Sequence, residues 1–519
     1  MLRTIRLFTC AALAAATPTA TIARDVTMTI RADQPGTPID RHIFGQFAEH
    51  LGAGIYGGVW VGPKSRIPNV RGIRSDVVAA LRNIQVPVVR WPGGCFADEY
   101  HWREGIGPRG QRPTTVNTHW GGVTEDNAFG THEFMDFAEQ IGADAYVSGN
   151  VGNGTPAEMA EWVEYMTAPA GSLAELRAKN GHKAPWTLPY LGLGNELWGC
   201  GGSMHIGYAA EVTRRYSTFV KVPQGTRTLK MASGATENDT PDKGLPWTEG
   251  MMQIAGDRID GFGLHYYTFY EPGTKKSSAT DFGERDWARI LANAERIEPY
   301  IAKHSAIMDK YDPARRVALA VDEWGTWYTA TPGSNPGFLQ QQNTLRDAMV
   351  AAVTLNIFTH HGDRLKLANI AQMVNVLQSM ILTDGPKMVL TPTYHVFEMY
   401  KPFQDATSVP VELKTSWYGI DEWNMPAVSA TAARAKDGDL YVALANVDPN
   451  QPATVTAALA GSPATTVTGR ILDAPAMQSL NDFAHPDVVK PAAFDGARLS
   501  GGSLTATLPP HSIVVLRLH

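Results

Sequence analysis

The sequence predicts an α/β protein, a (β/α)8 TIM barrel followed by a C-terminal antiparallel β-sandwich domain. Between residues 42 and 402, eight short apolar runs alternate with helical patterns. From residue 403 to 519 the runs give way to segments in which apolar and polar residues alternate. The length of 519 residues suits a barrel of roughly 250–400 residues with a smaller second domain.

The strands of the predicted barrel are continuous apolar runs rather than alternating ones. Such runs are typical of parallel strands that are buried on both faces. An open, doubly wound sheet is the alternative, but no glycine-rich phosphate-binding motif supports it. The eight predicted strands cover residues 42–50, 86–94, 143–150, 189–196, 229–235, 260–267, 316–324 and 367–375.

Helix signals lie between these strands. The segment "SDVVAALRNI" (75–84) has apolar residues on one helical face and Ser75 in the position of an N-terminal cap. Thr155, Pro156 and Glu158 form the pattern of a capping box with proline at the first helical position. These helices complete the alternation that the barrel requires.

The predicted second domain reads as a sandwich. Its sequence alternates apolar and polar residues, and "KDGD" (436–439) is typical of a hairpin turn. The strand-like segment 24–41, before the barrel, is predicted to join the same sandwich.

The first 23 residues have the pattern of a signal peptide. A basic start, "MLRTIR", is followed by the apolar "LFTCAALAAA" and by small residues suited to cleavage. The apolar part is too short to span a bilayer. We therefore predict an exported protein, either periplasmic or secreted.

The bulk composition excludes some classes of partner. The chain is 44% apolar and 18% charged, with a net charge of −6 and no long basic or acidic block. These values argue against a dedicated nucleic-acid or anionic-membrane binder. We also find no His/Asp spacing that suggests a catalytic metal, so no metal or cofactor is expected.

Polar residues end most of the predicted strands, where barrel enzymes carry their sites. Glu196 ends the fourth strand and Glu323 the seventh, so both are expected at one mouth. Paired carboxyl groups are the machinery of glycoside hydrolysis: one donates a proton and the other acts as nucleophile or base. The other polar strand ends are Glu49, His50, Arg90, Asn150, Asn195, His265, Tyr267, Asp322, Gln372 and Asn375.

The motifs around the two glutamates resemble a known family. "GNELW" (194–198) and "VDEWGTWY" (321–328) are similar to the acid/base and nucleophile motifs of clan A glycoside hydrolases. Together with "FGQFAEHLG", "VVRWPGGCFADEYHWREGIGPRGQRP" and "IAQMVNVLQSMILTDG", they resemble glycoside hydrolase family 51 over residues 42 to 400. The resemblance implies a retaining, exo-acting α-L-arabinofuranosidase that also carries a C-terminal sandwich.

The resemblance also implies roles for individual residues. Glu196 matches the general acid/base, Glu323 the nucleophile, and Asn195 the residue that hydrogen-bonds the sugar 2-hydroxyl. Arg90 matches an arginine that keeps the nucleophile ionised. The remaining matches are polar sugar contacts at Glu49, Tyr267 and Gln372 and aromatic residues bordering the leaving group at Trp120 and Trp327.

The implied partner is an oligo- or polysaccharide bearing arabinofuranose, and the family suggests a homo-oligomer, often a hexamer. Other activities remain open on the same scaffold: β-xylosidase, endo-β-1,4-glucanase, or sugar binding without catalysis. An exo-acting enzyme requires a closed pocket, whereas an endo-acting enzyme requires an open cleft.

One position departs from many family members. Cys95 stands where they carry a sugar-contacting asparagine, and a thiol is a poor hydrogen-bonding substitute. The only other cysteine after the signal segment is Cys200, four residues beyond Glu196. Two buried free thiols are one interpretation. Our hypothesis is a Cys95–Cys200 disulfide beside the sugar site, which Cα atoms more than about 7 Å apart would exclude.

Overall fold

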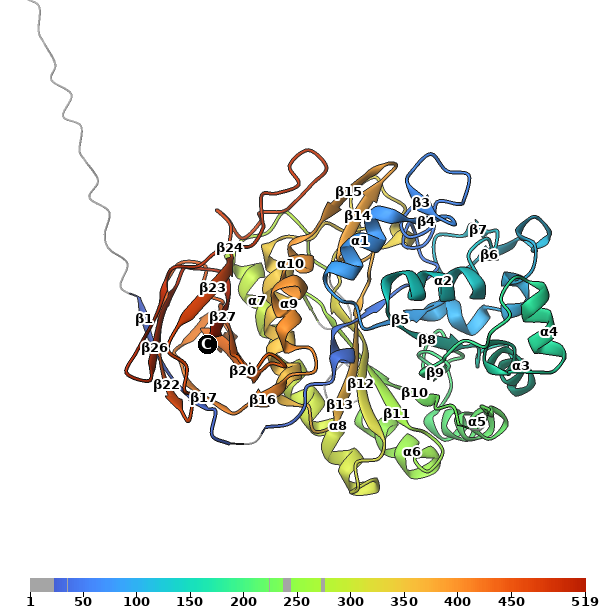
Figure 1. The fold of residues 1–519 in the computed structure, drawn as a ribbon, viewed down its shortest axis with the longest axis horizontal. Helices are drawn as coiled ribbons and strands as arrows, with labels where there is room; N and C mark the ends of the chain where they lie inside the picture. The colour runs from blue at the N-terminus through green and yellow to red at the C-terminus, as the bar shows by residue number, and fades with distance from the viewer. Residues whose placement is uncertain (1–22, 35, 224, 237–243, 272–275) are drawn as a thin grey trace, which may run out of the picture.

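The computed structural model describes residues 23–34, 36–223, 225–236, 244–271 and 276–519. It contains a closed eight-stranded barrel with a two-sheet sandwich packed against one side (Figure 1). Within these described residues, no helix is both long and apolar enough to cross a membrane.

The barrel strands are all parallel, and their order around the barrel follows their order in the chain. This closure confirms the predicted (β/α)8 barrel and excludes the open sheet. The first strand is shorter than predicted because a 3-10 turn, Arg41–Phe44, precedes it. The strands are β2 Gly45–Phe47, β5 Val88–Trp91, β8 Asp144–Gly149, β9 Tyr190–Leu193, β10 Leu229–Thr236, β11 Gly261–Thr268, β12 Ala318–Thr326 and β13 Leu365–Ala371.

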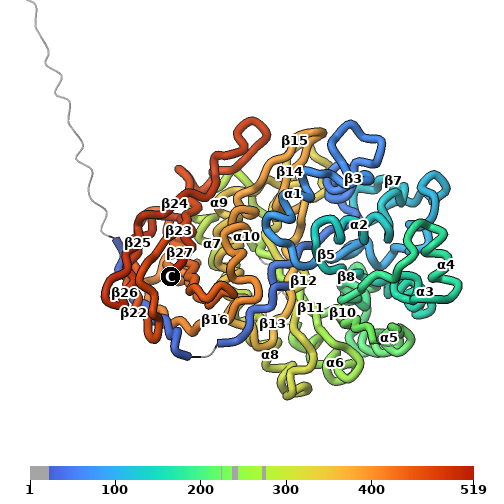
Figure 2. Tube along the Cα trace, viewed as in Figure 1, coloured from blue at the N-terminus to red at the C-terminus, as the bar shows by residue number. Residues whose placement is uncertain are grey.

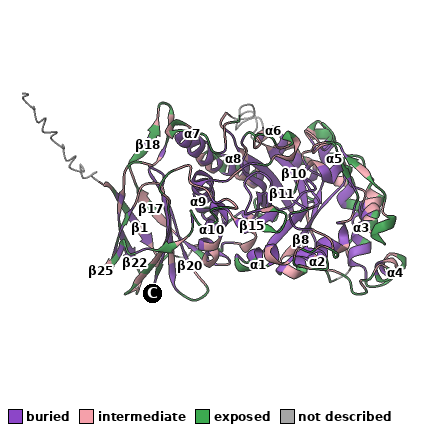
Figure 3. Cartoon of the chain, turned by 90° about the horizontal axis from the view of Figure 1, so that it is seen from above, coloured by how far each residue is buried: buried purple, intermediate pink, exposed green. Residues whose placement is uncertain are grey.

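The helices surround the barrel, and their strand-facing sides are buried (Figure 3). Thr155 caps α3, because its side chain accepts the N–H of Glu158. The helices of the described chain are α1 Ser75–Asn83, α2 Thr131–Ile141, α3 Pro156–Thr167, α4 Ser172–Lys179, α5 Ile206–Phe219, α6 Leu245–Ala255, α7 Glu284–Glu295, α8 Ile297–Tyr311, α9 Leu345–His360 and α10 Pro392–Tyr400.

The predicted cap at Ser75 is wrong. Ser75 is the first residue of α1, and the cap position is held by Arg74, which makes no side-chain capping bond. The Arg74 side chain is fully buried and donates to the carbonyl oxygens of Gly57 and Gly385. These contacts join Arg74 to distant segments, and local sequence does not reveal them.

The sandwich consists of a five-stranded sheet, β17-β1-β22-β26-β25, and a six-stranded sheet, β16-β20-β21-β27-β23-β24. Strand β1, Arg24–Arg31, runs parallel to β22 and antiparallel to β17, so the start of the described chain lies among its last strands (Figure 2). The other strands are β16 Thr407–Val409, β17 Val411–Lys414, β20 Val428–Arg434, β21 Leu440–Asn446, β22 Ala453–Ala460, β23 Val467–Leu472, β24 Ala492–Ala493, β25 Ala497–Ser500, β26 Ser503–Leu508 and β27 Ser512–Leu518.

The sandwich packs on the barrel helices rather than on the barrel mouth. Helix α9 contacts β20 and β21, and α7 contacts the hairpin of β18, Trp417–Ile420, and β19, Trp423–Pro426. Trp287 on α7 donates its indole N–H to the carbonyl of Val447 at 2.8 Å. The sandwich is therefore anchored through the helical layer.

The segment between β5 and α2 is a long connection that follows the second barrel strand. It contains three 3-10 turns, Cys95–Glu99, Trp102–Gly105 and Arg109–Gln111, and the hairpin of β6, Thr115–Asn117, and β7, Val123–Glu125. Shorter hairpins are formed by β3, Asn69–Val70, with β4, Ile73–Arg74, and by β14, Ile381–Asp384, with β15, Lys387–Leu390.

Candidate active site

A small pocket opens at the C-terminal ends of the barrel strands. Its wall brings together most of the predicted site residues. Arg90 lies beneath the wall and contacts two of its members, and Cys200 lies just outside it. The polar strand ends that do not line the pocket are His50, Asn150, His265, Asp322 and Asn375. None of the residues assigned to this wall in the described chain comes from the sandwich. The lining residues are Glu49, Leu51, Gly94, Cys95, Trp120, Asn195, Glu196, Tyr267, Glu323, Trp327, Leu339, Gln372 and Leu377.

Glu323, on β12, is held by donors on both carboxylate oxygens. Arg90 Nη1 donates to Oε1 at 2.6 Å, and the Tyr267 hydroxyl donates to Oε2 at 2.7 Å. Burial lowers the pKa of Arg90, but the charges of Glu323 and Asp322 outweigh it and leave that pKa above its ordinary value. Arg90 therefore stays cationic beside Glu323.

Glu196 sits in a tight turn directly after β9, and its side chain is 17% exposed against 6% for Glu323. His265 Nδ1 lies 2.8 Å from its Oε1. Burial opposes the charged form of His265, but Glu323, Asp322 and Glu196 together raise its pKa to about 10. A cationic imidazole therefore lies against both glutamates at neutral pH.

The two glutamates converge although three strand steps separate β9 from β12 in the barrel. One carboxylate oxygen of Glu196 lies within 4.8 Å of one of Glu323, and a nitrogen of His265 lies within the same distance of both. Retaining glycosidases place their carboxyl groups about 5–5.5 Å apart, and inverting ones about 6.5–9.5 Å apart. The close approach of the two glutamates is compatible with the retaining arrangement.

Glu49 is a second buried carboxylate in the pocket, between three donors. Its Oε1 accepts from the indole of Trp120 at 2.8 Å and the backbone of Phe96 at 3.2 Å, and its Oε2 accepts from Gln372 at 3.1 Å. Burial and then the charge of Glu323 raise the pKa of Glu49 to about 7, against the lowering effect of these bonds.

Asn195 is oriented from below. Arg90 Nη2 donates to its side-chain oxygen at 2.7 Å, and the Ser148 hydroxyl accepts from Arg90 Nε at 3.1 Å. The amide nitrogen of Asn195 then lies on the pocket side, 3.8 Å from Cys200 Sγ. A single buried guanidinium thus links Asn195 to Glu323.

Aromatic rings border the pocket. Trp327 packs edge-on against Tyr267, with ring centroids 5.0 Å apart, and stacks on Phe269 at 5.6 Å. Trp120 reaches the pocket from the segment after β5 and is fixed by its bond to Glu49. Such rings offer flat apolar surfaces against which a sugar can lie.

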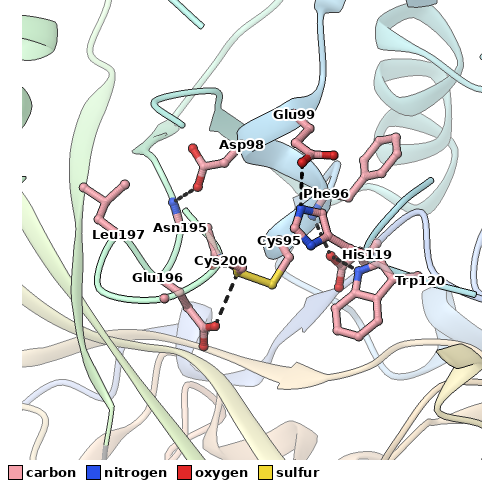
Figure 4. Close-up of a disulfide and its surroundings, with 12 residues drawn as sticks. Cys95, Phe96, Asp98, Glu99, His119, Trp120, Asn195, Glu196, Leu197 and Cys200 are labelled. Carbon is pink, nitrogen blue, oxygen red and sulfur yellow. Dashed lines mark hydrogen bonds and ion pairs between the residues drawn. A yellow bond between two sulfur atoms is a disulfide. The ribbon is translucent and has the colours of Figure 1, made fainter. Parts of the chain in front are cut away.

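Cys95 and Cys200 are joined in a disulfide, with Cα atoms 5.5 Å apart (Figure 4). This distance lies within the limit stated above. The bond ties the turn after β5 to the turn after β9, and Cys200 Sγ lies 3.6 Å from Glu196 Oε2. Cys95 therefore contributes a disulfide sulfur to the pocket wall, which has no hydrogen to donate to a sugar.

Within the described residues, two groups of side chains have metal-like spacing, and both are engaged in other bonds. Cys95, Cys200 and Glu196 form one group, but the two sulfurs are bonded to each other. Glu196, His265 and Glu323 form the other. There the two ring nitrogens of His265 face carboxylates, Nδ1 at 2.8 Å from Glu196 and Nε2 at 3.5 Å from Asp322, so both carry protons.

Sequence reasoning gave no role to two residues near the carboxylates. His265 was noted at the end of its strand, and its position in the register beside Glu323 is what places it between the glutamates. Asp98 lies within the quoted motif "CFADEY", and only the contacts of its carboxylate reveal it. Leu51, Gly94, Leu339 and Leu377 also line the pocket, and no sequence signal separates them from core residues.

Comparison with known proteins identifies relatives along the whole chain. Two family models match, the α-L-arabinofuranosidase 1 domain over residues 80–279 and the α-L-arabinofuranosidase C-terminal domain over residues 322–512. A protein of Bacteroides ovatus named intracellular exo-α-L-arabinofuranosidase is 49% identical over 515 residues, which is 99% of each chain.

Solved structures agree with these matches. The family 51 arabinofuranosidase of Xanthomonas axonopodis pv. citri is 56% identical and superposes with a TM-score of 0.94 over 96% of this chain and all of that one. The α-L-arabinofuranosidase of Thermotoga maritima, in its arabinose complex, is 29% identical with a TM-score of 0.83, over 95% of this chain and 99% of that one.

The predicted export is contradicted by one of these relatives. The Bacteroides ovatus protein, which matches nearly the full chain, is named intracellular. A basic start followed by an alanine-rich run is a pattern of composition, and composition alone does not establish cleavage or transport. The proposed signal peptide, residues 1–23, lies outside the described residues except for Ala23.

The same conclusion follows from the barrel with its convergent glutamates, from the two family models and from the near full-length relatives. The chain belongs to the α-L-arabinofuranosidases of glycoside hydrolase family 51.

Proposed function

We propose that this chain removes terminal α-L-arabinofuranose from plant-type oligo- or polysaccharides by double displacement, with Glu323 as nucleophile and Glu196 as acid/base. The observation that carries the proposal is the approach of the two carboxylates to within 4.8 Å in one small pocket. That approach suits direct attack on the anomeric carbon by one carboxylate while the other serves the leaving oxygen.

In the first step, a Glu323 oxygen attacks the anomeric carbon while the bond to the leaving oxygen breaks. Glu196 gives its proton to that oxygen. His265 donates to Oε1 of Glu196 at 2.8 Å, which leaves Oε2 to carry the proton. Arg90 and Tyr267 hold Glu323 in a single orientation for attack.

In the second step, Glu196 is a carboxylate and takes a proton from water. The water oxygen bonds to the anomeric carbon and releases Glu323 as a carboxylate. The cationic His265 lies within reach of both glutamates and balances the charge that moves between them. Two inversions at the same carbon give overall retention.

The pocket suits one terminal sugar. Glu49, Gln372 and Asn195 present polar groups to hydroxyls, while Trp120 and Trp327 close the sides. An endo-β-1,4-glucanase requires a cleft in which a chain continues past the nucleophile. The β-xylosidase alternative differs only in the sugar and is separated by assay.

A panel of aryl glycosides tests the activity. We expect turnover of aryl α-L-arabinofuranoside far above that of aryl β-xyloside or soluble glucan, and proton NMR of the first product should show the α-anomer. Azide tests the roles: with Glu196→Ala it should give the retained glycosyl azide, and with Glu323→Ala the inverted one. An inverted first product from the unaltered enzyme would contradict double displacement.

The oligomeric state is a separate part of the proposal and rests on family resemblance. A homo-oligomer, and specifically a hexamer of 56.3 kDa chains, would be seen by sedimentation velocity. A single monomeric species at micromolar concentration would contradict it.

A further inference from the structure

We propose that Asp98 is a positioning residue for the acid/base, because its buried carboxylate anchors the backbone immediately before Glu196. The inference deepens the proposed function, since it rests on Glu196 as the proton donor. Asp98 is not among the described residues that line the pocket. It acts on Glu196 through the backbone of Asn195.

The carboxylate of Asp98 gathers three backbone N–H groups from two other loops. Its Oδ1 accepts from Val151 at 2.7 Å and Gly152 at 2.9 Å, both after β8. Its Oδ2 accepts from the backbone of Asn195 at 2.7 Å, after β9 (Figure 4). Asp98 is only 2% exposed, so water does not compete for these donors.

The turn that carries Glu196 requires such an anchor. Glu196 has φ of +41° and follows Gly194 at +81°, so a residue with a side chain is held in the left-handed region. An L-residue leaves that region unless its neighbours are fixed. Asp98 fixes the N–H before Glu196, and the Ser233 hydroxyl accepts the N–H after it, from Leu197 at 3.3 Å.

The packing around this anchor explains a glycine in the same turn. A side chain at Gly201 would begin 2.7 Å from Asp98 Oδ2 and 2.0 Å from the carbonyl oxygen of Asn195. The turn therefore folds tightly over the carboxylate. The disulfide joins the segment that carries Asp98 to the turn that carries Glu196. It attaches at Cys200, four residues beyond Glu196, and leaves the Asn195 side of the turn to Asp98.

Loss of the anchor should affect proton donation in particular. General acid catalysis depends on the alignment of the acid with the leaving oxygen. A poor leaving group, such as an alkoxide, departs only when protonated, whereas a dinitrophenolate departs without help. A misplaced Glu196 should therefore slow the first kind of substrate and spare the second.

The test is Asp98→Asn, assayed on methyl and 2,4-dinitrophenyl α-L-arabinofuranosides. Asparagine has the same shape but only one acceptor oxygen, so its NH2 must face at least one backbone N–H. We expect kcat/KM on the methyl glycoside to fall by about 10–100-fold, and on the dinitrophenyl glycoside by less than about threefold. Both substrates carry the same sugar, so any loss of sugar binding through Asn195 cancels in the ratio.

Asp448→Asn is the matched control. Asp448 is also 2% exposed, and it accepts from the backbone of Asn450 and Gln451 and from Arg24 within the sandwich region. The Asp448→Asn variant should be less stable, and the ratio of its kcat/KM values on the two substrates should be unchanged. If Asp98→Asn does not fold, Asp98→Ser removes the carboxylate without an opposing amide and is assayed in its place.

Equal losses on both substrates with Asp98→Asn would overturn the proposal, because they would indicate a general structural role. Glu196→Ala is the reference for complete loss of the acid/base. Its loss of kcat/KM on the methyl glycoside, relative to that on the dinitrophenyl glycoside, should exceed the relative loss in Asp98→Asn. If Glu196→Ala itself shows no dependence on the leaving group, the proposed acid/base role fails instead, so the two failures are distinguishable.

Discussion

The barrel mouth and the sandwich core are built on opposite principles. The mouth buries charged groups, including Arg90, Asp98, His265 and Glu323, each no more than 5% exposed. The buried cluster of the sandwich consists of apolar side chains from both sheets, such as Val442, Val455, Leu504 and Leu516. The first region is held by ion pairs and hydrogen bonds between distant loops, and the second by apolar contact.

This difference teaches where function and stability reside. Burial of a charge costs free energy that its partners only partly return, so a cluster of buried charges does not persist for stability alone. Burial of apolar area is the main favourable contribution to folding. Substitutions in the mouth should therefore reduce activity more than stability, and substitutions in the sandwich should do the reverse.

Glu323→Ala should have the largest effect. Removal of the proposed nucleophile should lower kcat/KM on aryl arabinofuranoside by at least about 10⁴-fold, while circular dichroism should show an unchanged fold. Glu323→Gln is the matched control, because it keeps the shape beside Arg90 and Tyr267. Both variants should be inactive, and a rate near that of the unaltered enzyme in either would remove Glu323 from the mechanism.

Leu516→Ala tests the sandwich half of the comparison. Leu516, on β27, is fully buried, and its truncation should lower the free energy of unfolding by about 2–5 kcal/mol. The kcat of the folded protein should stay within about twofold, and urea denaturation followed by active-site titration measures both quantities. Thr505→Ala, on an exposed face of β26, should change stability by less than about 0.5 kcal/mol. A large loss of kcat in Leu516→Ala would contradict the separation of the two regions.

Removal of the disulfide sharpens the comparison, because it is a stabilising element within the mouth. The double variant Cys95→Ser/Cys200→Ser should lose about 2–4 kcal/mol of unfolding free energy, since the bond closes a loop between residues 105 apart. Activity should remain within about tenfold, because Asp98 still fixes the backbone before Glu196. The unaltered enzyme, once reduced with a dithiol and alkylated, should show the same losses of unfolding free energy and activity as the double variant. Unchanged stability in the double variant would show that the bond adds none.

The smallest expected effect lies where barrel and sandwich meet. Glu398 on α10 contacts His395 and accepts from Arg470 of β23 at 3.0 Å. His395 and then Arg470 outweigh burial and lower the pKa of Glu398 to about 2. Its stabilisation is therefore present above about pH 4.5 and is lost as the pH falls toward 2.

Because Arg470 is half exposed, we expect Glu398→Gln to cost less than about 1 kcal/mol at pH 6. The variant should also lose less stability than the unaltered enzyme between pH 5 and about 3, as measured by urea midpoints at each pH. The same acid dependence in both proteins would contradict the assignment.

Several features follow from the sequence alone. Continuous apolar runs predict the eight parallel strands, and alternation after residue 403 predicts the sandwich, because each pattern reflects how many faces of a strand are buried. Glu196 and Glu323 are identifiable at the ends of two strands, since parallel strands in a barrel all end at the same mouth. The motifs around them also indicate the family.

Other features exist only in the tertiary structure. Arg74 before α1 bonds to distant carbonyl groups, His265 supplies the charge beside the glutamates, and Asp98 anchors the turn of Glu196. Each depends on partners from other segments of the chain, so no local pattern marks it. Periodicity reports the burial of a strand or helix, whereas the direction of a hydrogen bond is decided only when distant loops meet.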